Sequence, residues 1–159
     1  MILILDDVLK SRECSALKHL FLCNGNDHEK FDGNNTTVFN YYYGSVAKID
    51  SILDKVVEGA KILKSDCELD WCQIVLWSEG NAHQFHFDQT EERTILTSIT
   101  NLNVEYLGGR THFFDDIILE PKVGRTVYFN GNDYLHGVTP LEFGTRLTLV
   151  AWYKNELNN

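Results

Sequence analysis

The sequence predicts a mainly β fold with flanking helices: an antiparallel sandwich or barrel of jelly-roll type whose core is covered by two N-terminal helices. From Trp71 onward, apolar and polar residues alternate in many short runs, and Gly, Pro and Asn turn signals separate these runs. This pattern is typical of short antiparallel strands. Before Trp71, apolar residues recur at helical spacing in two segments, which indicates two amphipathic helices.

The chain opens with a short apolar run, Met1–Leu5, that is followed directly by acidic residues. A signal peptide needs a basic start and a longer apolar stretch, and a membrane span needs roughly 20 apolar residues. We therefore interpret residues 1–5 as a first strand.

Two helices are predicted in the first third of the chain. Ser11 is the candidate N-cap of the first helix, and Asp50 or Ser51 lies near the start of the second. The apolar stripes comprise Cys14, Leu17, Leu20 and Phe21 in the first helix, and Ile49, Ile52, Leu53, Val56, Ala60 and Leu63 in the second.

The segment Asn24–Gly44 between these helices is polar, rich in Gly and Asn, and ends in consecutive tyrosines. Its length favours a functional loop over a simple connection. We expect either a surface loop or a mobile lid over a binding site. The alternative is that Tyr41–Tyr43 belong to an ordinary strand with two residues packed inside.

The remaining chain is predicted to form short strands. The expected ranges are Trp71–Trp77, Gln84–Phe87, Thr94–Asn103, Thr111–Phe114, Arg125–Phe129, Tyr134–Val138 and Arg146–Tyr153. The last of these is apolar on both faces, which fits a barrel strand whose outer side is covered by the helices.

The composition describes a globular chain with an acidic balance. With 159 residues, of which 43% are hydrophobic and 12% aromatic, the sequence predicts one domain over residues 1–159. The formal net charge of -9 repels phosphate backbones and anionic lipid headgroups, and no run of basic residues supplies a local patch. We therefore expect neither nucleic acid nor a membrane as partner.

Four cysteines, Cys14, Cys23, Cys67 and Cys72, show no C-x-x-C pair. Without such spacing, buried thiols are favoured over disulfides or zinc ligands. The cysteines therefore indicate a reducing compartment, and we expect a cytoplasmic protein.

A candidate metal site is formed by His86, Asp88 and His136. His86 and Asp88 lie two residues apart, a spacing that on a strand points both side chains the same way, and His136 lies in a later predicted strand. Two imidazoles and one carboxylate make the facial triad of non-haem iron(II) oxygenases, which leaves coordination positions open for a co-substrate and O2. An H-x-D triplet also arises by chance, so the pattern needs a second signal.

Arg146 is that second signal. It opens an otherwise apolar strand, on the same predicted face as Thr148, Val150 and Trp152. A buried guanidinium needs an anion partner, and its planar donors suit a carboxylate. A surface arginine at a strand end is the alternative, but in combination with the triad the anion site is favoured.

These residues stand in an order that resembles the prolyl 4-hydroxylase branch of the 2-oxoglutarate/Fe(II) dioxygenases. The segments that carry the resemblance are Gln73–Gly80, His86–Asp88, Leu102–Asn103, Gly108–Phe113, His136–Pro140 and Gly144–Arg146, with Leu5–Leu9 and Glu13–Cys14 near the start. The resemblance covers nearly the whole chain and implies a double-stranded β-helix.

The resemblance also implies roles for individual residues. Fe(II) would be bound by His86, Asp88 and His136, and Arg146 would bind the distal (C5) carboxylate of 2-oxoglutarate, with Thr111 and Trp152 lining the co-substrate pocket. Two positions depart from the family pattern. Trp77 stands where relatives usually have tyrosine, and Asn101 stands where a tyrosine often helps to bind the distal carboxylate. Both are expected in the pocket, with altered contacts.

The activity implied is hydroxylation of an unactivated C–H with consumption of O2 and 2-oxoglutarate and release of succinate and CO2, with ascorbate as an auxiliary reductant. Asp88 indicates hydroxylation, because halogenating relatives lack the carboxylate ligand. The expected substrate is a prolyl residue in a peptide or protein, proline-rich segments included. Two alternatives stay open: hydroxylation of a free amino acid or other small molecule, and a cupin-like metal-binding module without catalysis.

Strand alternation gives two further expectations near these residues. His83 should face away from His86 and lie on the rim, and Thr111 rather than His112 should face the pocket.

Overall fold

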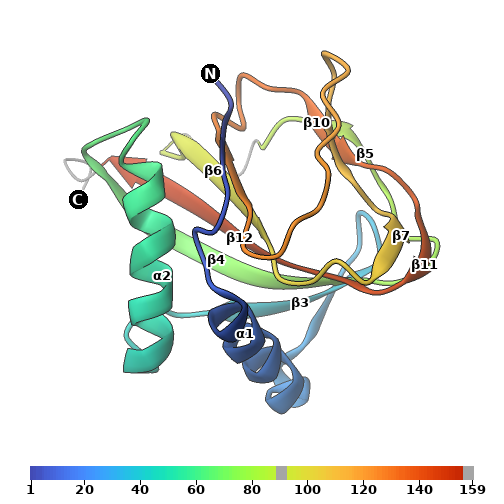
Figure 1. Cartoon of the computed structure of the whole chain (residues 1–159), viewed down its shortest axis with the longest axis horizontal. Helices are drawn as coiled ribbons and strands as arrows, with labels where there is room; N and C mark the ends of the chain where they lie inside the picture. The colour runs from blue at the N-terminus through green and yellow to red at the C-terminus, as the bar shows by residue number, and fades with distance from the viewer. Residues whose placement is uncertain (89–92, 156–159) are drawn as a thin grey trace.

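The computed structural model describes residues 1–88 and 93–155, and its strands form three sheets (Figure 1). The large sheet has the order β1-β9-β6-β12-β4-β3-β2, a second sheet has the order β5-β10-β8, and β7 pairs with β11. The strands are β1 (Leu3–Leu5), β2 (Glu29–Phe31), β3 (Thr36–Tyr41), β4 (Cys67–Trp77), β5 (His83–His86), β6 (Leu96–Asn101), β7 (Tyr106–Gly108), β8 (Thr111–Phe113), β9 (Thr126–Phe129), β10 (His136–Val138), β11 (Leu141–Gly144) and β12 (Arg146–Asn155). The prediction of a mainly β chain with flanking helices is confirmed.

Helices α1 (Ser11–Cys23) and α2 (Ala47–Ala60) lie on one side of the large sheet, and β5 and β10 lie on the other side (Figure 1). The helices and the sheet share one buried apolar cluster, which includes Leu17, Phe21, Leu53 and Val56 from the helices and Ile74, Tyr128, Leu149 and Tyr153 from the strands. Removal of these side chains from water holds the helices against the sheet.

The start of α1 differs in detail from the expected one, whereas Asp50 lies near the start of α2 as predicted. Lys10, rather than Ser11, is the N-cap of α1, and its backbone N–H donates to the Glu13 carboxylate at 2.8 Å. In α2, Asp50 lies in the first turn and accepts a 2.8 Å hydrogen bond from the Tyr41 hydroxyl. A carboxylate at this position also suits the positive end of the helix dipole.

The segment Asn24–Gly44 is not an irregular loop. It contains a short 3-10 turn (Gly25–Asp27) and the hairpin of β2 and β3, which extends the large sheet beyond β4. Tyr41 is the last residue of β3 and is buried, whereas Tyr42 and Tyr43 are exposed. The expected loop is therefore wrong, and the alternative of a strand holds for Tyr41.

Strand β12 lies between β4 and β6 and pairs with both. Its residues Leu147, Leu149, Ala151 and Tyr153 belong to the cluster beneath the helices. On the opposite face, Val150 packs with Val138 of β10 and Leu141 of β11. The face that also carries Arg146 and Trp152 is therefore directed toward the second sheet, where His86 and His136 lie.

Strands β7 and β11 were not predicted. They pair through Leu141 opposite Gly108 and Gly144 opposite Tyr106. Both are short and end in glycine, so neither presents the alternation that marked the other strands. This pair closes the end of the structure where β12 begins.

Cys14, Cys67 and Cys72 are buried free thiols, but Cys23 is exposed, so the expectation of a buried thiol is wrong for that residue. Burial raises the pKa of Cys72 to about 12, which disfavours its reactive thiolate form. No helix in residues 1–88 or 93–155 has the length and apolar character needed to cross a membrane.

Candidate metal and anion site

Three potential metal ligands come together at the second sheet. His86 ends β5, His136 begins β10, and the two residues are paired in the antiparallel ladder. Asp88 Oδ1 lies 3.6 Å from His86 Nε2 and 3.4 Å from His136 Nε2. The three ligand atoms lie within 4.8 Å of one another.

Both imidazoles are oriented in the same way. His86 Nδ1 lies 2.8 Å from the Gln84 carbonyl oxygen, and His136 Nδ1 lies 2.8 Å from the Tyr134 carbonyl oxygen. Because a carbonyl oxygen can only accept, each Nδ1 carries the hydrogen and each Nε2 presents a lone pair. A hydrogen bond of this kind orients metal-binding histidines in many proteins.

The donor set fits a metal ion. Two imidazole lone pairs and a carboxylate oxygen converge, and such a group is costly unless a cation lies among them. Ligand atoms about 2.1 Å from one metal and at right angles to each other are about 3 Å apart, close to the separations found. Two imidazoles and one carboxylate suit iron(II), with coordination positions left open.

Asp88 is held from the side opposite the imidazoles. Thr97 Oγ1 of β6 donates to Asp88 Oδ2 at 2.7 Å, and the Asp88 backbone N–H donates to the Gly131 carbonyl oxygen at 2.8 Å. Burial raises the pKa of Asp88, but the neighbouring His136 and His86 outweigh burial and hold it below its usual range. The carboxylate is therefore ionised, as a metal ligand must be.

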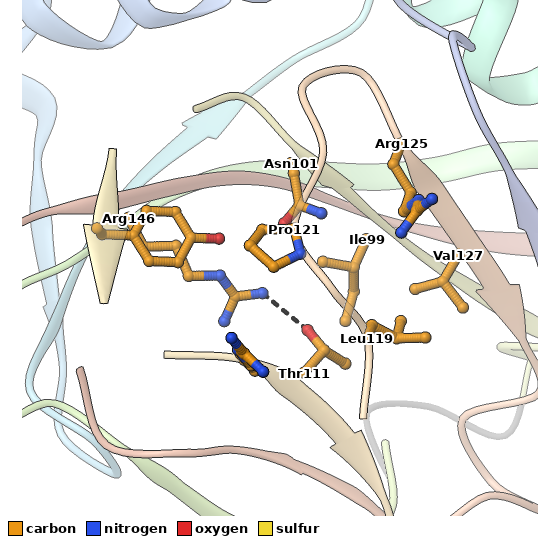
Figure 2. Close-up of a pocket in the computed structure, with 10 residues that line it drawn as sticks. Ile99, Asn101, Thr111, Leu119, Pro121, Arg125, Val127 and Arg146 are labelled. Carbon is orange, nitrogen blue, oxygen red and sulfur yellow. Dashed lines mark hydrogen bonds between the residues drawn. The ribbon is translucent and has the colours of Figure 1, made fainter. Parts of the chain in front are cut away.

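Arg146 is almost completely buried, with 2% of its surface exposed. Its Nη2 donates to Thr111 Oγ1 at 2.7 Å, while Nε and Nη1 have no hydrogen-bond partner (Figure 2). Within the described ranges, no carboxylate forms an ion pair with this guanidinium. Burial lowers the pKa of Arg146, and the nearby Tyr106 hydroxyl opposes that change. A buried cation with unused donors is suited to bind an anion.

A small pocket lies beside Arg146. Figure 2 shows Thr111, Asn101 and Pro121 around the guanidinium, and the lining also includes Ile99, Tyr106, Arg110, Leu119, Arg125 and Val127. Thr111 is opposite Val138 in the ladder, whereas His136 is opposite Phe113. The anion site therefore lies about two strand residues, or roughly 7 Å, from the metal-ligand position.

The other two predicted pocket residues differ in placement. Trp77 is paired with Arg146 across β4 and β12, and the Arg146 Cζ lies 5.4 Å from the centre of its ring, a cation–π distance. Trp152 lies roughly 20 Å farther along β12 and does not line the Arg146 pocket. It is paired with Thr97 and stacks on Trp71 at 3.9 Å between ring centres. The structure therefore places Trp152 on the Asp88 side.

The two remaining histidines near the site also have defined positions. The ring of His83 stacks on His86 with 3.8 Å between centres, so the expectation that the two face apart is wrong. An irregularity in the β5–β10 pairing, between His136 and Val138, breaks simple alternation there. His112 stacks on the exposed Phe85, on the side away from Thr111.

The sequence profile of the 2OG-Fe(II) oxygenase superfamily matches residues 72–154, which is just over half of the chain. The chain belongs to this superfamily. The match includes the three candidate ligands of this oxygenase and Arg146. No curated protein sequence matches it.

Solved prolyl hydroxylases share the fold of this oxygenase. A viral collagen prolyl hydroxylase from Paramecium Bursaria Chlorella virus-1, in complex with 2OG, superposes with a TM-score of 0.80 at 19% identity, covering 97% of this chain and 95% of that chain. A Pseudomonas putida prolyl-4-hydroxylase gives 0.81 at 19% identity, covering 97% and 92%. A Trichoplax adhaerens prolyl hydroxylase in complex with a hypoxia inducible factor peptide fragment gives 0.75 at 14% identity, covering 98% and 84%.

Two residues of this oxygenase site were not predicted, Thr97 and Tyr106. Alternation along the predicted strand Thr94–Asn103 puts Thr97 on the same face as Asn101, and this signal could have identified it. Tyr106 lies in the unpredicted β7, and the sequence around it contains no comparable signal.

Proposed function

We propose that this chain is an Fe(II)- and 2-oxoglutarate-dependent dioxygenase that hydroxylates a prolyl residue in a peptide or protein and releases succinate and CO2. In this proposal residues 1–159 are one catalytic domain with a double-stranded β-helix core. The observation that carries it is the buried Arg146, whose Nε and Nη1 lack hydrogen-bond partners. This guanidinium lies roughly 7 Å from the point where the ligand atoms of His86, Asp88 and His136 come together.

Each side chain has a defined task. His86, Asp88 and His136 would hold Fe(II) through Nε2, Oδ1 and Nε2. Arg146 would bind the C5 carboxylate, and the separation from the metal ligands suits a five-carbon dicarboxylate. Iron, together with 2-oxoglutarate and O2, supplies the oxidising chemistry when bound. Ascorbate is proposed as an auxiliary reductant.

The surroundings of Arg146 favour a single orientation of the co-substrate. Thr111 fixes one edge of the guanidinium, and the Trp77 ring lies against it. Asn101 lies at the pocket wall. Apolar side chains such as Ile99 and Leu119 exclude water and so strengthen the attraction between the guanidinium and a carboxylate. Thr111, Trp77 and Asn101 are therefore proposed as co-substrate contacts.

Prolyl substrates are the first choice because the superposed proteins are prolyl hydroxylases, one of them in complex with a peptide. On the Asp88 side, the partly exposed Trp71, which stacks on the buried Trp152, provides an aromatic ring of the kind that packs against proline rings. With a net charge of -9, nucleic acids and anionic membranes are not proposed as partners. Three buried free thiols favour a reducing cytoplasm.

The proposal is tested by incubating the protein with Fe(II), 2-oxoglutarate, ascorbate and a proline-containing peptide library, and by mass spectrometry for products that have gained one oxygen atom. His136→Ala should abolish Fe(II)-dependent succinate formation. Arg146→Ala should strongly raise the 2-oxoglutarate requirement while leaving metal binding intact. Retained turnover in His136→Ala, or unchanged 2-oxoglutarate dependence in Arg146→Ala, would remove that residue from its proposed role.

Two alternative activities have distinct signatures in the same assay. Hydroxylation of a free amino acid or another small molecule would leave all peptides unchanged but consume 2-oxoglutarate when a small-molecule library is supplied. A cupin-like metal-binding module would bind Fe(II) and form no succinate with any substrate. The unpaired donors of Arg146 argue against the module, because metal binding alone gives them no partner.

A further inference from the structure

Tyr106 stands next to Arg146 although β7 is distant from β12 in the sequence. In the β7–β11 pair it lies opposite Gly144, the residue that ends β11 just before β12 begins at Arg146. A Cβ atom on Gly144 would lie 2.8 Å from the Glu105 carbonyl oxygen and 3.3 Å from Tyr106 Cα. Only glycine fits this approach without displacement, so Gly144 keeps β7 close to the start of β12.

The ring of Tyr106 is fixed by packing. It is 8% exposed and belongs to a buried cluster with Trp77, Val138 and Leu141. Because these neighbours are apolar, they hold the ring without engaging its hydroxyl. The hydroxyl is therefore presented in one direction, into the pocket that Tyr106 lines together with Arg146 and Thr111.

The hydroxyl of Tyr106 has spare hydrogen-bonding capacity. Arg146 acts on it both through its charge and as a hydrogen-bond donor, and because a guanidinium can only donate, the hydrogen of the Tyr106 hydroxyl remains available. Thr111 is in a related situation: its oxygen accepts from Arg146 Nη2, so its own hydrogen remains to be donated. The pocket thus presents two hydroxyl hydrogens beside the unpaired N–H groups of a buried guanidinium.

We propose that Tyr106 is a specificity-determining residue whose hydroxyl donates to the distal carboxylate of the co-substrate, beside Arg146 and Thr111. This inference rests on the proposed function. It also accounts for Asn101, which stands where relatives often have a tyrosine: Asn101 and Tyr106 line the same pocket, so the hydroxyl is supplied from β7 instead of β6. A carboxylate accepts several charge-assisted hydrogen bonds at once, which a neutral end group does not.

The test compares Tyr106→Phe with the wild-type protein in binding experiments without turnover. Mn(II) replaces Fe(II), O2 is excluded, and calorimetry gives the Kd of 2-oxoglutarate and of 2-oxopentanoate, which lacks the distal carboxylate. We expect Tyr106→Phe to raise the Kd of 2-oxoglutarate about tenfold or more, the effect of losing a hydrogen bond to a charged group. The Kd of 2-oxopentanoate should stay unchanged, because that acid has no distal carboxylate to receive the hydrogen.

Tyr43→Phe is the matched control, because it removes the same atom from an exposed tyrosine whose hydroxyl bonds Asp54 at 2.7 Å. It should leave both dissociation constants unchanged. An unchanged Kd for 2-oxoglutarate in Tyr106→Phe would overturn the inference. An equal rise for both acids would also overturn it, since that result marks a structural role. Failure of the wild-type protein to bind 2-oxoglutarate would instead contradict the proposed function itself.

Discussion

Thr97 Oγ1 donates a 2.7 Å hydrogen bond to Asp88 Oδ2, so that the other carboxylate oxygen, Oδ1, faces His86 and His136. The contact joins the large sheet, which carries Thr97 in β6, to the segment that follows β5 in the second sheet. One carboxylate oxygen of Asp88, Oδ2, is thereby held by Thr97, and the other, Oδ1, is left to bind a metal ion. Supporting contacts of this kind set the orientation of a metal ligand.

We expect Thr97→Val to weaken metal binding about tenfold, because Asp88 loses the partner that orients it. The measurement is a titration of metal-free protein with Mn(II). Thr100→Val is the control: it removes a buried hydroxyl from the same strand, one bonded to Thr126 at 2.8 Å and not to Asp88. Equal metal affinity in Thr97→Val and the wild-type protein would show that Asp88 is oriented without Thr97.

Gly131 is the second residue on which the Asp88 carboxylate depends. A Cβ atom there would lie 2.5 Å from Asp88 Oδ2 and 2.7 Å from Thr97 Oγ1. Gly131→Ala should therefore displace the carboxylate and weaken Mn(II) binding by at least about tenfold. In Gly25→Ala, the added methyl group meets nothing within 4 Å, and metal affinity should be retained. Normal metal binding in Gly131→Ala would mean that Asp88 can move aside without leaving the metal.

Gly59 sets how closely α2 approaches the large sheet. A Cβ atom at this position would lie 2.1 Å from the Tyr128 hydroxyl oxygen, and Tyr128 is fully buried in β9. Alanine favours a helix by about 1 kcal/mol over glycine, but overpacking of a core costs about 1–3 kcal/mol. We expect Gly59→Ala to lower the free energy of unfolding by about 1–2 kcal/mol in urea denaturation.

A double-mutant cycle separates this clash from other effects on Gly59. Tyr128→Phe removes the hydroxyl that an alanine would meet, at the cost of its 2.9 Å hydrogen bond to the Val56 carbonyl oxygen. The double variant should be more stable than the sum of the single changes predicts. Stabilisation by Gly59→Ala alone would contradict the close contact between helix and sheet.

Asp6 gives a prediction for the dependence of stability on pH. Hydrogen bonds from Arg125 and then Lys122 lower the pKa of Asp6 from 3.8 to about 2. A lowered pKa in the folded protein means that the contribution of Asp6 is complete above the unfolded pKa and is lost as the pH falls through about 2. Asp6→Asn should therefore lower the thermal midpoint near neutral pH, and the difference should vanish near pH 2.

Added salt is the internal check for the Asp6 prediction. The ion pairs of Asp6 are partly exposed, so their effect should shrink at high ionic strength. An Asp6→Asn thermal midpoint that differs from wild type by the same amount at every pH would contradict a contribution from the charge. Such a result would assign the effect to packing between the N-terminal segment and the loop that carries Lys122 and Arg125.

Two of the candidate metal ligands were predictable because they lie close together in the sequence. His86 ends β5 and Asp88 follows two residues later, a spacing that in an extended chain directs both side chains to one face. The same alternation placed Arg146 inside and favoured Thr111 over His112, and each of these positions agrees with the structure. The two helices were predictable for a similar reason, since an amphipathic stripe depends only on neighbouring residues.

Alternation failed where the pairing between distant strands is irregular. His83 lies beside His86 because the β5–β10 ladder shifts between His136 and Val138. Trp152 shares a face with Arg146, as predicted, yet the length of β12 carries it to the opposite end of the interior. A shared face does not by itself mean a shared pocket.

The sequence by itself determined the mainly β class of fold and indicated the three candidate metal ligands and Arg146. Local spacing predicted the strands, the helices and the faces of their residues, and the resemblance in residue order joined His136 and Arg146 to His86 and Asp88. Only the tertiary structure decided that Thr97 holds Asp88 and that Tyr106 stands beside Arg146. Both relationships join strands that are far apart in the chain and depend on register and packing between sheets. No local pattern encodes such contacts, because they arise only when the strands pair and the core closes.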